Sequence, residues 1–302
     1  MPGTAPGTRD EPADELQRHR PMLFGVAYRL LGSATDADDV LQDAYLRWRD
    51  VATAEVREPR RYLTRIVTRL ALDRLRARGR HESYVGPWLP EPVTTETLAP
   101  DPAETAERRD SAATATLYLM ERLDPVERAV FVLRAAFEVP YADIAEIVER
   151  DAAHCRQLFH RARDRLADDR RRFAPSRQDH SQLLEHFVQA ARRGDLAGLR
   201  KVLHDGVVAW SDGGGKASAA RNAVIGVEKV ARFFAGIYGP DRDVDLEARE
   251  INGSPGLVVR GPGRFHVLTF AVSGDVISAV FLVSNPDKLE RFGTGPTDAG
   301  GR

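Results

Sequence analysis

Arginines in the first third of the chain have the spacing that places side chains on one face of a helix. The set comprises Arg61, Arg65, Arg69 and Arg76. At ~100° per residue they lie within about 80° of one another, beside an apolar stripe of the same period. Residues 57–82 hold nine basic and three acidic residues, an excess too large for pairing within the segment. Because guanidinium groups suit phosphates and base edges, this face favours an anionic partner over a merely solvated surface.

A second group of basic and amide side chains opens a predicted helix-turn-helix. A short helix from Tyr141 to Val148, a three-residue turn and a longer helix from Ala152 to about Arg171 have that spacing. The first residues of such a second helix reach base edges in a major groove. The candidate DNA-reading residues are His154, Arg156, Gln157, His160 and Arg161. An ordinary helical hairpin has the same pattern, so the spacing alone leaves both interpretations open.

A glycine-rich segment invites a phosphate-loop interpretation that fails. It consists of Asp212, Gly213, Gly214, Gly215 and Lys216. A Walker A loop needs glycine where Trp210 stands, and serine or threonine where Ala217 follows the lysine. We expect either a turn with positive φ or a docking or ligand-binding loop, and the sequence favours neither.

Residues typical of enzymes and metal sites form no recognisable group. His186, His204 and His266 have no paired spacing for a metal ion. The single cysteine, Cys155, excludes an internal disulfide, and its place on an apolar helical face predicts a packed side chain. No G-x-S-x-G nucleophile pattern occurs. We therefore predict a protein without enzyme activity, catalytic residues, a metal site or a cofactor.

Length and composition indicate the number and type of domains. A chain of 302 residues is too long for one hydrophobic core and predicts two or three domains. Its 42% hydrophobic and 29% charged residues are typical of a soluble globular protein, and no apolar run approaches the ~20 residues of a membrane-spanning helix. Residues 1–15 lack the apolar segment of a signal peptide, so we expect a cytoplasmic protein with no membrane partner.

Helix signals fill the first 82 residues and return after residue 112. Gly32 ends a predicted helix, Thr35 is the expected N-cap of the next, and Pro59 opens a third. In the later part, Asp124 and Glu127 combine an N-cap with a capping glutamate around a first-turn proline. The N-terminal half is therefore predicted to be helical.

The segment between these helical parts is rich in proline and acidic residues, which is typical of a linker. Within it stand Trp88, Leu89, Pro90, Glu91 and Pro92. A disordered segment seldom places a tryptophan beside a leucine, so this motif predicts docking to another part of the chain.

The last 120 residues change from helical to mixed character. Short helices from Leu183 to Arg193 and from Leu196 to Leu203 precede segments of alternating apolar residues. The predicted strands are Val207 to Ser211, Val244 to Ile251, Gly256 to Arg260, Phe265 to Val272 and Val276 to Val283, with a helix from Val227 to Ile237 after the first. Ser273-Gly274-Asp275 is a hairpin signal. We expect an α+β domain with a curved antiparallel sheet.

Three segments in order resemble a known family. Asp36 to Trp48 and Tyr62 to Arg78 look like region 2, and Leu123 to Leu166 like region 4, of an extracytoplasmic-function RNA polymerase sigma factor. The linker motif, the glycine-rich segment and a further motif are similar to the SigJ-like subgroup, which has a SnoaL-like C-terminal domain. That further motif is Asn285, Pro286, Asp287, Lys288 and Leu289.

The resemblance implies two all-α sigma domains followed by an α+β SnoaL-like cone. The expected parts are a disordered tail (1–14), region 2 (15–82), the linker (83–109), the region 4 helix-turn-helix (110–174), the SnoaL-like domain (180–292) and a second disordered tail (293–302).

The resemblance also implies partners. Region 2 would melt and read the −10 promoter element and bind the clamp helices of RNA polymerase core, and region 4 would read the −35 element beside the flap. The polymerase-binding residues would be Asp36, Asp39, Gln42 and Asp43. Promoter DNA would meet Arg65, Arg69, Arg76, Tyr62 with the loop before it, and the helix-turn-helix residues given above.

In the resembling subgroup the C-terminal domain acts as a built-in regulator in place of a separate anti-sigma protein. Our hypothesis is that the loop 212–216 holds the linker at residues 88–92 and so fixes the spacing of regions 2 and 4. Residues 285–289 are expected to take part as a further regulatory interdomain contact. A small-molecule ligand in the cone is left open. Two alternatives remain: a helix-turn-helix regulator acting without polymerase, and an enzyme whose active site is the cone and whose helices serve as targeting domains.

Overall fold

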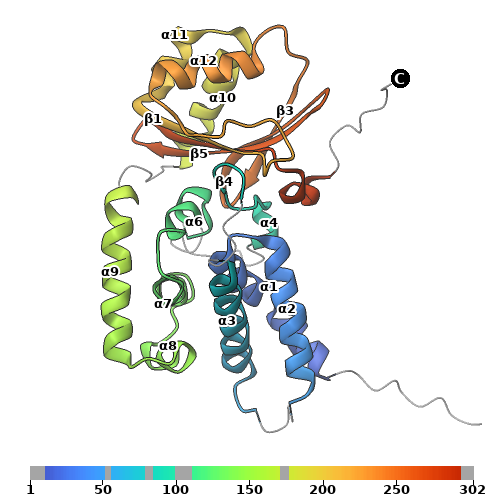
Figure 1. Cartoon of the computed structure of the whole chain (residues 1–302), viewed down its shortest axis with the longest axis vertical. Coiled ribbons are helices and arrows are strands. Elements are labelled where there is room, and N and C mark those ends of the chain that lie inside the picture. Colours follow the sequence, from blue (N-terminus) through green and yellow to red (C-terminus); the bar gives the residue numbers. More distant parts are fainter. Residues whose placement is uncertain (1–10, 52–55, 79–83, 99–110, 171–176, 294–302) are drawn as a thin grey trace, which may run out of the picture.

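Five stretches of the chain are described by the computed structural model: residues 11–51, 56–78, 84–98, 111–170 and 177–293. Most of the two expected tails, and residues 52–55 in the loop before Tyr62, lie outside them. Helix α1 begins at Glu11, inside the segment that we expected to be a tail. In Figure 1 the helices of the N-terminal half lie below a sheet-containing domain formed by the C-terminal residues.

The first bundle contains α1 (Glu11–Leu31), α2 (Ala34–Arg49) and α3 (Pro59–Arg78). Gly32 ends α1 with a φ of 63°, a left-handed conformation that glycine adopts without strain. The expected N-cap at Thr35 is wrong. Ser33 caps α2 instead, because its backbone is extended and its hydroxyl accepts a hydrogen bond from the Asp36 N–H at 3.1 Å.

The described residues of the second helical part form α4 (Thr95–Leu98), α6 (Thr114–Met120), α7 (Pro125–Ala135), α8 (Tyr141–Val148) and α9 (Ala152–Arg170). Asp124 caps α7 by accepting the Val126 N–H, as predicted. The predicted capping role of Glu127 is wrong, because its buried carboxylate accepts a hydrogen bond from Arg165 of α9 at 2.7 Å. Helices α8 and α9 have the predicted helix-turn-helix spacing, and Cys155 is buried.

One continuous apolar core joins the two helical parts. It contains Trp48 of α2, Leu63 of α3, Phe131 of α7 and Leu158 of α9. Helix α3 consequently packs against α7 and α8. Two regions that the sequence predicts as separate domains therefore share their buried surface in this structure.

The C-terminal domain contains α10 (Arg177–Arg193), α11 (Leu196–Val202) and α12 (Val227–Tyr238), and the short 3₁₀ helices η2 (Pro286–Lys288) and η3 (Glu290–Phe292) follow its last strand. Its strands are β1 (Leu203–Asp212), β2 (Val224–Ile225), β3 (Asp245–Ile251), β4 (Ser254–Gly261), β5 (Arg264–Ser273) and β6 (Val276–Val283).

These strands form one sheet in the order β2-β1-β6-β5-β4-β3. The α+β prediction is confirmed, with one departure from an antiparallel sheet: β1 and β6 run parallel. Their relative direction is set by the long chain between them, whereas β5 and β6 are joined by the predicted hairpin at Gly274. The short strand β2 was not predicted.

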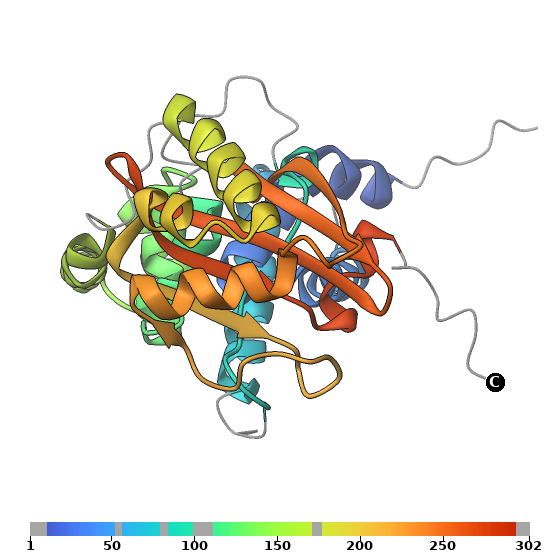
Figure 2. The same cartoon turned by 90° about the horizontal axis from the view of Figure 1, so that it is seen from above.

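The sheet has two differently covered faces, because successive residues of a strand point to opposite sides. Ala209 and Leu282 belong to the core under α10, α11 and α12. Trp210 and Phe281 face the other way, where their rings meet Tyr118 of α6. Figures 1 and 2 show the three helices on the outer face and the helical half of the molecule on the opposite one. The sheet thus positions the ends of β1 and β6 against the linker.

Candidate functional site

A buried carboxylate at the end of β1 holds the linker. Asp212 is 0% exposed, and its Oδ2 accepts a hydrogen bond from the Leu89 N–H at 2.9 Å. Its Oδ1 accepts from the Gly214 N–H at 3.0 Å and from the Tyr84 hydroxyl. A carboxylate shielded from water needs such donors, because an unsatisfied buried charge is costly. Asp212 therefore binds the main chain of the linker and one of its side chains.

The ammonium group of Lys288 completes this contact, which we call the linker clasp (Asp212, Lys288 and Leu89). The Lys288 Nζ lies 2.7 Å from Asp212 Oδ2 and also donates to the Leu89 carbonyl. It lies 4.2 Å from the centre of the Trp88 ring, within cation–π range. Burial lowers the pKa of Lys288, and the charge of Asp212 opposes that shift. One ion pair thus holds both backbone polar groups of Leu89.

Glycines next to Asp212 let the chain approach the C-terminal motif closely. Gly214 and Gly215 have φ values of 58° and 75°. A Cβ on Gly214 would lie 2.3 Å from the side-chain nitrogen of Asn285, which in turn donates to the Tyr84 hydroxyl at 3.0 Å. Lys216 pairs with Asp287 at 2.6 Å on the surface. The glycine-rich segment is therefore both of the things we expected, a positive-φ turn and a docking loop.

Glu91 of the linker faces the other way, toward α2. Its buried Oε2 accepts hydrogen bonds from the Ala34 N–H at 2.9 Å and the Thr35 N–H at 3.1 Å. The first N–H groups of a helix lack partners within the helix, and its dipole favours a negative charge there. The Glu91 carbonyl also accepts the Tyr28 hydroxyl at 2.7 Å. The linker is therefore bound between the C-terminal domain and the first bundle.

A second anchor is Asn252, in the turn between β3 and β4. Its Oδ1 accepts the Val93 N–H at 3.2 Å, and its own N–H donates to the Val93 carbonyl at 2.9 Å. Its Nδ2 donates to the Ala112 carbonyl at 3.0 Å, just before α6, and to the Tyr28 hydroxyl. Sequence reasoning missed Asn252, Tyr28 and Tyr84. The Asn252-Gly253 pair signals a hairpin turn but not the contacts made by its side chain.

The arginine face of α3 (Arg61, Arg65, Arg69 and Arg76) lies partly against α8. Arg61 is 3.1 Å from Asp143 and 3.0 Å from Glu146. Arg69 is 2.8 Å from Glu149 and also donates to backbone carbonyls of α8. Acidic residues of the second helical part thus pair with two of the four arginines, Arg61 and Arg69, in this structure.

The other α3 residues predicted to bind DNA differ in exposure and in their partners. Arg65 is exposed, and Arg76, also exposed, pairs with Asp73 at 3.1 Å. Tyr62 is half-buried, with its ring centre 5.7 Å from that of Trp48. Part of the Tyr62 ring is thus used in core packing.

Acidic residues predicted to bind polymerase pair with α3. Arg74 lies 3.1 Å from Asp39 and 2.9 Å from Asp43, and Arg78 bonds to Asp36. Gln42 is exposed on the same helix. The structure brings these four residues together on one face of α2.

The first turns of α9 present the predicted DNA-reading side chains at the surface. Arg156, Gln157, His160 and Arg161 are exposed, and His154 is half-buried. Asp151 accepts the His154 N–H at 2.7 Å, which fixes the start of the helix. The guanidinium of Arg156 lies 5.5 Å from the centre of the Tyr141 ring. This turn adjoins Glu149, the partner of Arg69.

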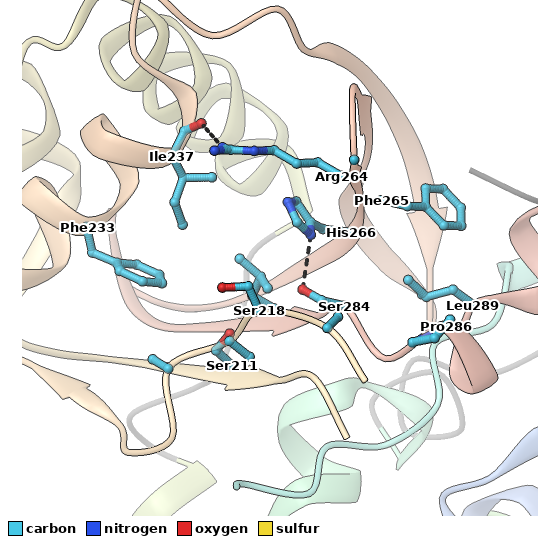
Figure 3. Close-up of a pocket in the computed structure, with 15 residues that line it drawn as sticks. Ser211, Ser218, Phe233, Ile237, Arg264, Phe265, His266, Ser284, Pro286 and Leu289 are labelled. Carbon is cyan, nitrogen blue, oxygen red and sulfur yellow. Dashed lines mark hydrogen bonds between the residues drawn. The ribbon is translucent and has the colours of Figure 1, made fainter. Parts of the chain in front are cut away.

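A pocket lies between α12 and the sheet, beside the linker clasp, and has a volume of about 690 Å³. Figure 3 shows Phe233 and Ile237 pointing toward His266, whose Nδ1 lies 3.0 Å from the Ser284 hydroxyl. Burial, assisted by the charge of Arg264, lowers the pKa of His266 to about 4, so its ring is neutral at pH 7. No carboxylate is among the described residues that line the pocket.

Neither a membrane-spanning helix nor a metal-binding cluster occurs among the described residues. None of the helices there is both long and apolar enough to cross a membrane. In the same part of the chain, no three histidine, cysteine, aspartate or glutamate side chains are arranged to hold a metal ion.

Comparison with known proteins matches both helical parts to one family. Residues 16–81 match sigma-70 region 2, and residues 114–166 match sigma-70 region 4. The ECF RNA polymerase sigma factor SigJ of Mycobacterium tuberculosis is 36% identical over 288 residues, covering 91% of this chain and 92% of SigJ. The probable ECF RNA polymerase sigma factor SigI of the same species is 28% identical over 277 residues, covering 90% and 92%.

The likeness extends to the three-dimensional structure. A crystal structure of M. tuberculosis SigJ superposes with a TM-score of 0.75 at 33% sequence identity, covering 94% of this chain and 99% of that one. The match therefore includes the C-terminal sheet domain as well as the helices.

Proposed function

Because this chain belongs to the extracytoplasmic-function sigma factors of RNA polymerase, we propose that its C-terminal domain controls promoter use by holding the linker between the two DNA-reading regions. The chain is an alternative sigma factor, which directs core polymerase to promoters. The observation that carries the regulatory proposal is the buried Asp212 carboxylate bound to the Leu89 N–H.

The clasp and its neighbouring contacts hold the described part of the linker and the residues just before α6. Trp88 and Glu91 lie against the first bundle, and Leu89 binds Asp212 at the end of β1. Asn252 joins Val93 to Ala112 at the start of region 4. Tyr118 of α6 also packs on the sheet. Because the C-terminal domain contacts both the linker and the start of region 4, it limits how far regions 2 and 4 can separate. This geometry supports the proposal.

In this structure regions 2 and 4 lie too close together to contact both promoter elements. Elements named −10 and −35 are about 25 base pairs apart, roughly 85 Å at 3.4 Å per base pair. Here Arg69 of α3 lies 2.8 Å from Glu149, only a few residues before the DNA-reading turn of α9. Both elements cannot be contacted from this arrangement, so we propose that polymerase binding separates region 4 from α3.

The contacts with polymerase and promoter DNA that we propose are those that the family resemblance implies. Asp36, Asp39, Gln42 and Asp43 would bind the clamp helices, and region 4 would meet the flap. Arg65, Arg69, Arg76 and Tyr62 would meet the −10 element, and the start of α9 the −35 element. The protein would act in the cytoplasm, without a separate anti-sigma factor, and the C-terminal domain would regulate without catalysis. The exposure of the first turns of α9 supports the proposed contact of this helix with the −35 element.

The test is transcription with purified core polymerase on promoters whose −35 to −10 spacer varies by one base pair at a time. We expect the wild-type chain to favour one spacer length and Trp88→Ala to spread its output over several. The matched control Trp88→Phe keeps an aromatic ring over Lys288 and should retain the preference. An identical spacer profile for wild type and Trp88→Ala would remove the regulatory proposal. Failure of the wild type to support any specific initiation would instead contradict its assignment as a sigma factor.

A further inference from the structure

The pocket beside the linker clasp has the size and lining of a small-molecule site. Its volume of about 690 Å³ is within the range of ligand pockets, about 300–1,000 Å³. Aromatic and aliphatic side chains form much of its wall, with three serines among them. The apolar side chains are Phe233, Ile237, Phe265, Leu282 and Leu289. Such a wall suits a flat apolar body of one or two rings.

The charge of the pocket indicates the polar end of its ligand. Arg264 is the charged side chain among the described lining residues, and one of its nitrogens donates to the Ile237 carbonyl at 3.0 Å. Within the described parts of the chain, no carboxylate pairs with it, so its other N–H groups are available to a ligand. His266 is neutral and Ser284 supplies a hydroxyl. Because Arg264 is the single cation among the described residues of the wall and the polar groups beside it are neutral, the pocket favours a ligand with one negative charge.

Two segments, the end of β1 and the residues after β6, contribute both to the wall of the pocket and to the clasp. Ser211 lines the pocket and Asp212, the next residue of β1, binds the linker. Ser284 and Pro286 line the pocket on either side of Asn285, which contacts Tyr84 of the linker. The Ser284 N–H donates to the Asp212 carbonyl at 2.8 Å, which ties the segments together.

We propose that this pocket binds a small aromatic monoanion, with its carboxylate toward Arg264, and that the bound ligand strengthens the hold of the clasp on the linker. A ligand packed on Ser211 and Ser284 favours the arrangement of these two segments that places Asp212 and Lys288 on Leu89. By thermodynamic reciprocity, the docked linker must strengthen ligand binding by the same factor. The coupling rests on the clasp described under the proposed function, whereas the binding site itself does not.

The probe for the experiment is 2-naphthoate, with uncharged 2-naphthalenemethanol as its isostere. Isothermal titration of the full chain at pH 7 should give one site with a Kd below about 1 mM, a range set by the small number of ligand atoms. The alcohol should bind at least about 10-fold more weakly, because it lacks the charge that faces Arg264. This comparison uses the wild-type protein and so does not depend on a variant that folds.

A pair of charge variants tests the place of binding. Arg264→Gln should weaken 2-naphthoate about 10-fold and leave the alcohol unchanged. Arg232→Gln removes the same charge from the exposed side of α12, outside the pocket, and should leave both affinities unchanged. Circular dichroism and thermal unfolding check that both variants are folded.

Hydrogen exchange measured by mass spectrometry tests the coupling without polymerase or DNA. Saturating 2-naphthoate should slow exchange in the peptide that contains Leu89 by about threefold or more, and Trp88→Ala should weaken 2-naphthoate by a similar factor. Absence of saturable binding, or equal affinity for acid and alcohol, overturns the site. Binding with unchanged exchange at Leu89 overturns the coupling. Neither result depends on spacer preference in transcription, so failure of this inference is distinct from failure of the proposed function.

Discussion

The ammonium of Lys288 lies 2.7 Å from the carboxylate of Asp212, which is fully shielded from solvent. Removing one partner of such a pair leaves the other charge buried and unpaired. We therefore expect Lys288→Met to lower the free energy of unfolding by about 2–4 kcal/mol in urea denaturation. The double variant Asp212→Asn with Lys288→Met should lose less than the sum of the two single variants.

The exposed ion pair of the same region is the matched control. Lys216 and Asp287 are 2.6 Å apart, but their side chains are 58% and 57% exposed. Lys216→Met should change the free energy of unfolding by no more than about 0.5 kcal/mol, because solvent screens surface pairs. If Lys216→Met and Lys288→Met lowered the free energy of unfolding equally, burial would not explain the contribution of the Asp212–Lys288 ion pair to stability.

Gly32 and Trp88 test how closely the linker packs on the first bundle. Gly32 has a φ of 63°, and a Cβ there would lie 2.7 Å from the edge of the Trp88 ring. Gly32→Ala should therefore lower the free energy of unfolding by at least about 1 kcal/mol and make the linker more sensitive to protease. In a Trp88→Ala background the steric part of this loss should disappear, and only the backbone strain should remain. A full loss in that background would mean that the ring does not lie against Gly32.

Local chemistry explains why much of the fold was predictable. Gly32 ends a helix, Asp124 caps one and Gly274 turns a hairpin, and each signal acts within a few residues of its own position. The helix-turn-helix spacing and the strand alternation are local in the same way. The parallel pairing of β1 with β6 was missed because it depends on the path of the whole domain.

The contacts of the candidate site could be predicted only in part. A tryptophan in an acidic, proline-rich linker indicates docking, whereas a role for residues 285–289 is implied only by the family resemblance. Nothing local indicates that Asn252 reaches Tyr28, or that Glu91 supplements Ser33 at the start of α2. The sequence shows the excess of basic residues on α3, but it does not show that Arg61 and Arg69 pair with Glu146 and Glu149, which lie far along the chain.

The pairing of α3 with α8 predicts that loosening it exposes the arginines that we propose to bind DNA. Glu146→Ala together with Glu149→Ala removes carboxylates that bind Arg61 and Arg69. These pairs are partly exposed, so the closed arrangement should lose only about 1 kcal/mol. The affinity of the free sigma factor for a fluorescent single-stranded oligonucleotide carrying a −10 sequence should then rise about threefold to fivefold, measured by anisotropy at fixed salt.

The control for this change is a double variant that removes two acidic charges elsewhere. Glu185 and Asp205 are exposed in the C-terminal domain, and Glu185→Ala with Asp205→Ala gives the same change in net charge. If this control raises the affinity equally, the gain comes from net charge and α8 does not shield the arginine face.

His266 predicts how stability depends on pH. Burial lowers its pKa to about 4, so between that value and the usual histidine pKa near 6.5 the unfolded chain binds a proton that the folded chain does not. The free energy of unfolding should therefore fall as the pH is lowered from about 6.5 to 4, by up to about 3 kcal/mol from this residue. His266→Gln should lack that component when urea denaturation is compared at several pH values. His180, whose pKa burial also lowers, titrates in both proteins and serves as an internal background. Parallel pH profiles for wild type and variant would contradict a neutral, buried imidazole in the pocket.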